Sequence, residues 1–295
     1  MKDFEEIKEY INSVLQEIDC ESADDYDRAM LLNALAATDK AVYNGEYEEY
    51  IRRGLDKVVT EDNISVSENS FVNYMYGNVC YSAGMADVAV NIARQTIDQP
   101  RAEAGYFVSQ EGRGCLCMAF TALSFYMNYE TRNGGKEHYN DIIAQFNALH
   151  NNLFPQVKKA ALAGDKDAFK ALSLYAAGTI DTMEVMDQAL YEIFARLRDI
   201  FKETVQILKS TVAGKSKDLM LIYSYVILKG CRMRVIQTEK YAGLAESIFE
   251  QATESKVADK DKVYETAAYI FAYSEYIRNR DYQDYGRNHG GVLWN

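Results

Sequence analysis

The sequence predicts an all-α protein, and three observations support this prediction. Only two prolines occur in 295 residues, Pro100 and Pro155, and proline is the residue that helix interiors tolerate least. Apolar residues recur at spacings of three and four along nearly the whole chain, which places them on one face of each helix. No stretch alternates between apolar and polar residues as a half-buried β-strand does.

The expected helices follow one another with short polar turns between them. Residues 4–18 start the series with one apolar stripe, and residues 26–43 and 46–60 predict a helical hairpin around the turn pair Asn44-Gly45. The other predicted helices cover residues 87–99, 116–129, 136–153, 165–177, 181–200, 201–212, 217–232, 238–255 and 259–278.

About twelve helices fit a bundle, a solenoid or a closed toroid, and periodicity does not choose among these. No repeat of fixed length is visible, which weakens the solenoid. No linker divides the chain, so residues 1–295 are expected to form one domain.

The overall charge argues against some partners. The chain has a formal net charge of -12 and an isoelectric point near 4.9. Nucleic acids and anionic membrane surfaces attract clustered Lys and Arg, so we expect neither partner. No run of about 18 apolar residues is present, which argues against a membrane-spanning helix. The charged N-terminal segment does not fit a signal peptide, and the cytoplasm is therefore the expected location.

The cysteines give no sign of a disulfide framework or a metal site. They are Cys20, Cys80, Cys115, Cys117 and Cys231, an odd number with irregular spacing. Cys115-x-Cys117 has the spacing of half a metal site, but no second pair of Cys or His has ligand spacing. We therefore expect no metal and no cofactor.

An acidic stretch, Asp24-Asp25-Tyr26-Asp27, has two interpretations. It is similar to the aspartate-rich metal box of terpene cyclases, which are also helical proteins, but its spacing departs from that box. No second metal motif occurs at a matching place. An N-cap followed by an acidic first helical turn is the favoured interpretation.

Five segments, in order along the chain, resemble segments of a known enzyme group. They cover residues 26–63, 94–107, 116–146, 223–230 and 276–294. The second reads RQTIDQPRAEAGYF, the fourth is YSYVILKG, and the last, YIRNRDYQDYGRNHGGVLW, resembles a closing His-Gly-x-Gly pattern. Together they resemble glycoside hydrolase families 88 and 105, the unsaturated glucuronyl and unsaturated rhamnogalacturonyl hydrolases. The resemblance implies an α/α toroid, which is a barrel of six helical hairpins.

The chemistry of these families requires a proton donor. They act on oligosaccharides whose terminal uronic acid carries a C4–C5 double bond, and a carboxylic acid protonates C4 while water is delivered to C5. The resemblance aligns the aspartates of the family with Cys117 and with Val72 or Asn73. Valine transfers no proton, and a thiol is a poor general acid for this step without special tuning. We therefore predict a degenerate catalytic site.

The resemblance also implies a candidate pocket at one mouth of the barrel. Its residues are Tyr26, Asn73, Tyr76, Tyr106, Arg113, Cys117, Arg287 and His289. In the family, the loop equivalent to residues 105–114 and the segment equivalent to residues 287–294 border the sugar site, so we expect both at the same mouth. His289 is either part of a surface tail or a rim residue that binds a carboxylate.

Three functions remain open. The first is a protein with a degenerate site and a carbohydrate-binding or structural role, and the second is an active hydrolase that uses other carboxylates, such as Glu68, Asp87, Glu103 or Glu111. The third is a helical interaction module unrelated to sugars. An acidic oligosaccharide is the expected partner in the first two cases. A pocket lined by tyrosines without carboxylates would favour the first function, and two facing carboxylates would favour the second.

Overall fold

The structure of this protein, a computed structural model, describes residues 4–19, 23–42, 45–56, 58–60, 63–64, 70–133, 137–187 and 189–288. Within these ranges the chain forms thirteen α-helices, one π-helical segment and one antiparallel pair of two-residue strands. The helices are α1 (Phe4–Glu17), α2 (Asp25–Val42), α3 (Glu48–Leu55), α4 (Ser70–Ser82), α5 (Ala86–Ile97), α6 (Ser124–Arg132), α7 (Tyr139–Asn152), α8 (Phe154–Leu162), α9 (Lys166–Val185), α10 (Tyr191–Thr211), α11 (Lys217–Arg232), α12 (Thr238–Glu254) and α13 (Val263–Asn288). The π-helical segment is η1 (Ala119–Leu123), and the strands are β1 (Val59–Thr60) and β2 (Asn63–Ile64).

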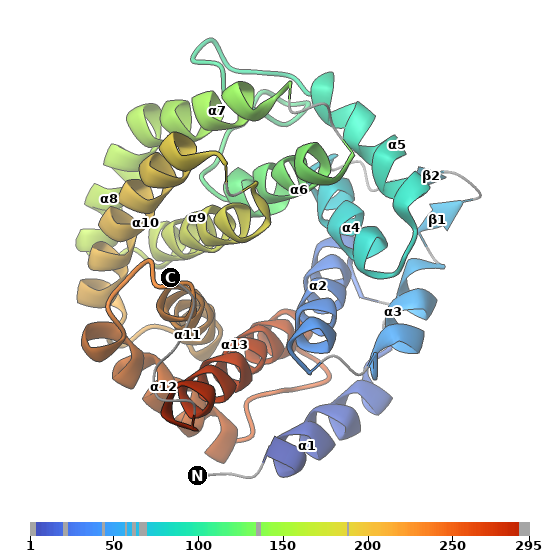
Figure 1. The fold of residues 1–295 in the computed structure, drawn as a ribbon, viewed down its shortest axis with the longest axis vertical. Coiled ribbons are helices and arrows are strands. Elements are labelled where there is room, and N and C mark those ends of the chain that lie inside the picture. Colours follow the sequence, from blue (N-terminus) through green and yellow to red (C-terminus); the bar gives the residue numbers. More distant parts are fainter. Residues whose placement is uncertain are drawn as a thin grey trace.

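The helices form a closed ring of two layers (Figure 1). The inner layer contains α2, α4, α6, α9, α11 and α13, and each of these contacts the next one around the ring. Contacts between α13 and α2 close the ring, so the fold is an α/α toroid and not an open superhelix. This confirms the predicted fold class.

The first and last helices of the chain, α1 and α13, pack together as one outer and inner pair of the ring. Helix α1 lies outside α13, where the hydroxyl of Tyr10 donates a 2.7 Å hydrogen bond to the carbonyl of Ala258. The hydroxyl of Tyr273 donates to the carbonyl of Phe4 at 3.2 Å. The ring is therefore fastened by side chains more than 240 residues apart in sequence, which local periodicity does not reveal.

All inner helices run in the same direction. Inner and outer helices alternate along the chain, and short connections make consecutive helices antiparallel; α7 and α8, separated by Leu153, act together as one outer partner. We call the end where the inner helices begin the amino mouth and the other end the carboxyl end. Contacts across the ring agree with this direction, because Tyr26 at the start of α2 stacks on Tyr264 at the start of α13.

Glycine allows two inner helices to approach closely. A Cβ at Gly178 of α9 would collide with the backbone of Ala119 and Phe120 in η1, so only glycine fits this crossing. Leu116, just before η1, is 1% exposed and anchors this part of the chain in the core. The crossing fixes η1 against α9 at a rigid position of the inner ring.

Some predicted helix boundaries are wrong. The sequence analysis predicted helices at 165–177, 181–200 and 201–212, but the chain forms one helix, α9, and then an uninterrupted α10. Gly178 lies in the gap between the first two predicted helices, whereas in the structure it lies inside α9, at the close crossing with η1. The sequence analysis also missed α4 and α8, and the helix predicted over 46–60 ends at Leu55 and is followed by β1. No helix in the described ranges is long and apolar enough to cross a bilayer.

Candidate functional site

A pocket of about 540 Å³ lies at the amino mouth. The start of α2 contributes Tyr26, and the start of α4 contributes Ser70, Phe71 and Val72. The remaining wall comes from residues 109–118 and from Thr121 of η1. We call this cavity the amino-mouth pocket. It collects aromatic, hydroxyl and sulfur groups from three neighbouring inner helices.

Helix α2 holds Tyr26 in place through its capped first turn. The backbone N–H of Asp27 donates to Oδ1 of Asp24 at 2.9 Å, which is the N-cap that the sequence analysis favoured. The ring of Tyr26 stacks on Tyr264, with the centroids 6.2 Å apart. Among the described residues, no group of three His, Cys, Asp or Glu side chains is placed to hold a metal ion. The acidic stretch therefore starts a helix and positions an aromatic face at the pocket.

The wall at residues 109–114 is a tight turn. The backbone N–H of Ser109 donates to the carbonyl of Arg113 at 2.8 Å, and the Ser109 hydroxyl accepts the backbone N–H of Arg113 at 3.2 Å. Gly112 has a φ of +77°, a left-handed conformation that favours glycine. The guanidinium of Arg113 pairs with Glu111 at 3.4 Å on the rim, where both side chains are largely exposed. This turn presents one cation and one anion to solvent at the edge of the pocket.

The loop before this turn is tied to the ring by polar contacts. The side-chain amide of Gln99 donates to the carbonyl of Val108 at 2.6 Å, and Gln145 of α7 accepts the N–H of Phe107 at 3.2 Å. Arg101 makes two hydrogen bonds to Asp141, at 2.6 and 2.9 Å. A bidentate pair of this kind fixes geometry as well as distance. The pocket wall therefore rests on a rigid frame.

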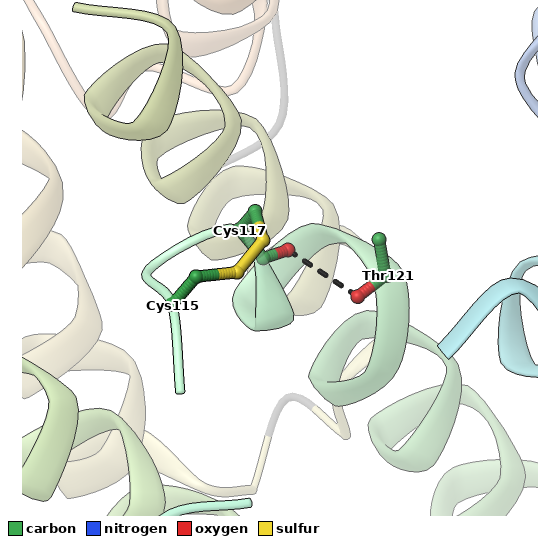
Figure 2. Close-up of a disulfide and its surroundings, with 3 residues drawn as sticks. All are labelled: Cys115, Cys117 and Thr121. Carbon is green, nitrogen blue, oxygen red and sulfur yellow. Dashed lines mark hydrogen bonds between the residues drawn. A yellow bond between two sulfur atoms is a disulfide. The ribbon is translucent and has the colours of Figure 1, made fainter. Parts of the chain in front are cut away.

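Cys115 and Cys117 form a disulfide in the pocket wall (Figure 2). Both residues are partly exposed and both line the pocket. The carbonyl of Cys117 accepts the backbone N–H groups of Phe120 and Thr121, at 3.0 and 3.1 Å, so Cys117 stands at the start of the helical run into α6. The sequence analysis found no disulfide framework and did not predict this bond, which needs only a local turn because a single residue separates the two cysteines. The same bond removes these sulfurs as thiolate ligands for a metal.

The structure places the predicted pocket residues in different surroundings. Tyr26, Arg113, Cys117 and also Val72 line the pocket, and the ring of Tyr106 lies against Gly114 in its wall. The sequence analysis did not name Ser70, Phe71, Cys115 or Thr121 as pocket residues, because their positions depend on α4 and on the disulfide turn.

Asn73 and Tyr76 instead point into the core, and neither lines the pocket. Asn73 is 2% exposed, and the buried hydroxyl of Tyr76 donates to the carbonyl of Asp25 at 3.1 Å. The backbone at Arg287 belongs to the last turn of α13, at the opposite end from residues 109–114, so the structure does not bring these two segments together. His289 lies outside the described residues.

A second group of polar side chains lies beside the pocket. The amino group of Lys170 of α9 lies 4.4 Å from the centroid of the Tyr264 ring. The pKa of Asp27 is raised by burial and by the charge of Asp24, while Lys170 acts in the opposite direction. Because the inner helices direct their N-terminal ends to this mouth, their dipoles add partial positive charge there. The amino mouth therefore combines partial positive charge from the helix starts with the cation of Lys170 and the carboxylates of Asp24 and Asp27.

The carboxyl end of the ring contains a buried ion cluster. Its members are Asp181 and Glu184 of α9, Lys229 and Arg232 of α11, and Glu275 and Arg278 of α13. Lys229 lies 2.7 Å from both Asp181 and Glu184. Arg232 lies 2.7 Å from both Glu184 and Glu275. None of the six side chains is more than 18% exposed.

The charges of this cluster are matched, which favours a structural role. Burial raises the pKa of Glu184, but Lys229, Arg232, Lys40 and Arg278 outweigh it and hold the pKa well below its usual range. The carboxylates here face cations and do not face each other as a catalytic pair. Sequence reasoning missed the cluster, although each of the three helices shows the same signal, two charged residues three positions apart.

Three solved structures have a similar fold. The family 105 glycoside hydrolase from C. acetobutylicum superposes with a TM-score of 0.74 at 15% identity, covering 94% of this chain and 99% of that one. A family 88 glycosyl hydrolase from Bacteroides vulgatus gives 0.72 at 9% identity, covering 94% and 100%. A protein from Klebsiella pneumoniae described as a possible member of family 105 gives 0.74 at 14% identity, covering 96% and 95%.

The toroid is that of glycoside hydrolase families 88 and 105. This agrees with the resemblance that the ordered sequence segments carry. At these identities the likeness establishes the fold and not the activity. No protein-family model matches the sequence, and no curated protein matches it either.

Proposed function

We propose that the amino-mouth pocket binds a uronate-bearing oligosaccharide and does not hydrate it at an enzyme-like rate. The observation that carries this proposal is the chemistry of the pocket wall at Val72 and Cys117. In the resemblance described above, Cys117 aligns with one of the family's aspartates, and either Val72 or its neighbour Asn73 aligns with the other. A valine or asparagine side chain has no acidic proton, and a disulfide-bonded cysteine has none either. In the reduced form, the Cys117 thiol is a poor general acid for this step without special tuning. The proposal includes one domain over residues 1–295 and a cytoplasmic location, both carried over from the sequence.

The remaining wall supplies the contacts that an acidic sugar needs. The guanidinium of Arg113 matches the geometry of a carboxylate, and the aromatic faces of Tyr26 and Phe71 suit the apolar face of a sugar ring. The hydroxyls of Ser70 and Thr121 add hydrogen-bonding groups. Glu111 is the carboxylate among the described lining residues, and it is exposed on the rim and paired with Arg113. These features support binding and do not supply a buried proton donor.

Titration calorimetry with unsaturated glucuronyl and galacturonyl disaccharides tests this proposal. We expect saturable binding that weakens about tenfold in Arg113→Ala, a loss of about 1.4 kcal/mol. Arg94→Ala is the matched control, because Arg94 is an exposed arginine on α5 whose hydrogen bond goes to Asn91 of the same helix. Loss of the carboxylate charge by methyl esterification of the sugar should reduce binding to a similar degree. Equal binding by the wild type and Arg113→Ala would contradict the assigned role of the pocket.

Asp27 supports a second candidate function, an active uronyl hydrolase. Its carboxyl group is half-buried beside the pocket, and burial followed by the charge of Asp24 raises its pKa, as a general acid requires. It does not belong to the pocket wall, which is why we rank this function second. Turnover of the unsaturated disaccharide that disappears in Asp27→Asn, while binding persists, would establish the second function in place of the first.

A further inference from the structure

The Cys115–Cys117 disulfide has an unusual position for a structural bond. A disulfide stabilises a fold mainly by closing a long loop in the unfolded chain, and the benefit grows with loop length. This bond closes around a single residue, Leu116. Leu116 is already anchored in the core, and the adjacent η1 is fixed against Gly178. The fold therefore gains little from the bond, which points to a chemical role.

The disulfide is also accessible to small molecules. Both cysteines are partly exposed and line the same cavity of about 540 Å³, which is large enough for a small organic thiol. The other cysteines in the described ranges differ, because Cys80 and Cys231 are buried and unpaired. Burial raises the pKa of each of these two thiols to about 12, which keeps them protonated and unreactive. Only the pair in the pocket combines access with exchangeable chemistry among the described cysteines.

We propose that Cys115 and Cys117 form a redox-active site that exchanges with low-molecular-weight thiols entering the amino-mouth pocket. A thiolate attacks Sγ of Cys115, a new sulfur–sulfur bond forms, and the bond to Cys117 breaks with its electron pair leaving on Cys117. Cys117 stands where the helical run into α6 begins, and a helix start stabilises a thiolate. Of the two sulfurs, Cys117 is therefore the better leaving group, because its position at the helix start stabilises the thiolate that forms.

The mixed disulfide has two balanced fates. The Cys117 thiolate attacks Cys115 again and expels the small thiol, which restores the starting state. Alternatively, a second thiolate attacks the sulfur of the bound small molecule, so that the small thiol leaves as its own disulfide and the protein is left as a dithiol. In this second case two thiols are oxidised and one protein disulfide is reduced. The proposal agrees with the expected cytoplasmic location, since cytoplasmic disulfides are mostly redox-active.

Redox titration of the native protein against mixtures of reduced and oxidised glutathione tests this proposal. After acid quenching and alkylation, mass spectrometry should show Cys115 and Cys117 passing together between dithiol and disulfide. Cys80 and Cys231 should stay free thiols across the series and carry no glutathione. In the reduced native protein, we expect iodoacetamide to label Cys117 and Cys115 about 100-fold or more faster than the buried cysteines. A pair that stays oxidised across the whole series, or labels no faster than Cys80, overturns the proposal.

Two further measurements separate this site from a structural bond. Reduction of Cys115–Cys117 should shift the melting temperature by less than about 2 °C, because the loop that it closes is minimal. A large shift would assign the bond to fold stability and overturn the proposal. Cys80→Ala is the matched control and should leave the redox titration unchanged. None of these readouts uses a sugar, so their outcome is independent of the proposed carbohydrate binding.

Discussion

The two ends of the ring differ in whether their charged side chains are buried or exposed. At the carboxyl end, six charged side chains from α9, α11 and α13 are buried against one another at distances down to 2.7 Å. At the amino mouth, Glu111 and Arg113 lie on an exposed rim, and the pocket wall behind them is aromatic, hydroxylic and sulfur-bearing. Charges that are fully paired hold a ring together, whereas an exposed cation beside an open pocket is available to a ligand. The comparison supports a structural role for the carboxyl end, and it agrees with the ligand binding that we propose for the amino mouth.

The largest expected effect comes from breaking the buried cluster. Glu184→Gln removes the carboxylate that Lys229, Arg232 and Arg278 share. The three buried cations then face only two carboxylates, Asp181 and Glu275, so one positive charge is left uncompensated. We expect the free energy of unfolding to fall by about 3–5 kcal/mol in urea denaturation. Glu111→Gln at the amino mouth is the matched control and should change it by less than about 0.5 kcal/mol. Similar losses in the two variants would remove the distinction between the two ends.

The same cluster should make the free energy of unfolding depend on pH in the acidic range. The pKa of Glu184 is lower in the folded state than in the unfolded chain, so its contribution is present above about 4.5, the ordinary glutamate value, and is lost as the pH falls through the lowered folded value. We expect the stability difference between wild type and Glu184→Gln to be full at pH 7 and to shrink below about 4.5. Denaturation curves of both proteins across this range measure it. A difference that stays constant down to strong acid would show that Glu184 is not held ionised by the cluster.

A smaller effect is expected where α9 crosses η1 near the pocket. Gly178→Ala adds a Cβ against the backbone of Ala119 and Phe120, which is less able to move than a side chain. We expect a loss of about 1–3 kcal/mol in unfolding free energy. Gly243→Ala is the control, because a Cβ there meets no atom within 4 Å. Unchanged stability in Gly178→Ala would show that the crossing has room to adjust.

The sequence predicted the helices better than it predicted the ring. Helical spacing identifies a chain segment as a helix, but it does not state which distant helix covers it, and the contact between α13 and α2 is of that kind. Gly178 shows the limit within one helix, because a glycine in the sequence signals a break as well as a close crossing. The closed toroid was predicted from the order of family-like segments and not from periodicity.

The candidate site was predictable only in part. Tyr26 and Cys117 line the pocket and lie in the family-like segments 26–63 and 116–146. Val72 and Arg113 also line it, but they lie outside those segments, and the helix that carries Val72, α4, was not predicted. Asn73 follows Val72 by one residue, and this single step around α4 turns its side chain from the pocket wall into the core.

The most direct test of the account uses stoichiometric protein and an unsaturated glucuronyl disaccharide. Ultrafiltration measures how much sugar the protein retains, and ultraviolet absorbance measures whether the retained sugar still carries its C4–C5 double bond. The account predicts retention that Arg113→Ala weakens, with the absorbance of the bound sugar unchanged over hours. Absorbance that disappears within minutes, or sugar that the wild-type protein does not retain, would contradict it.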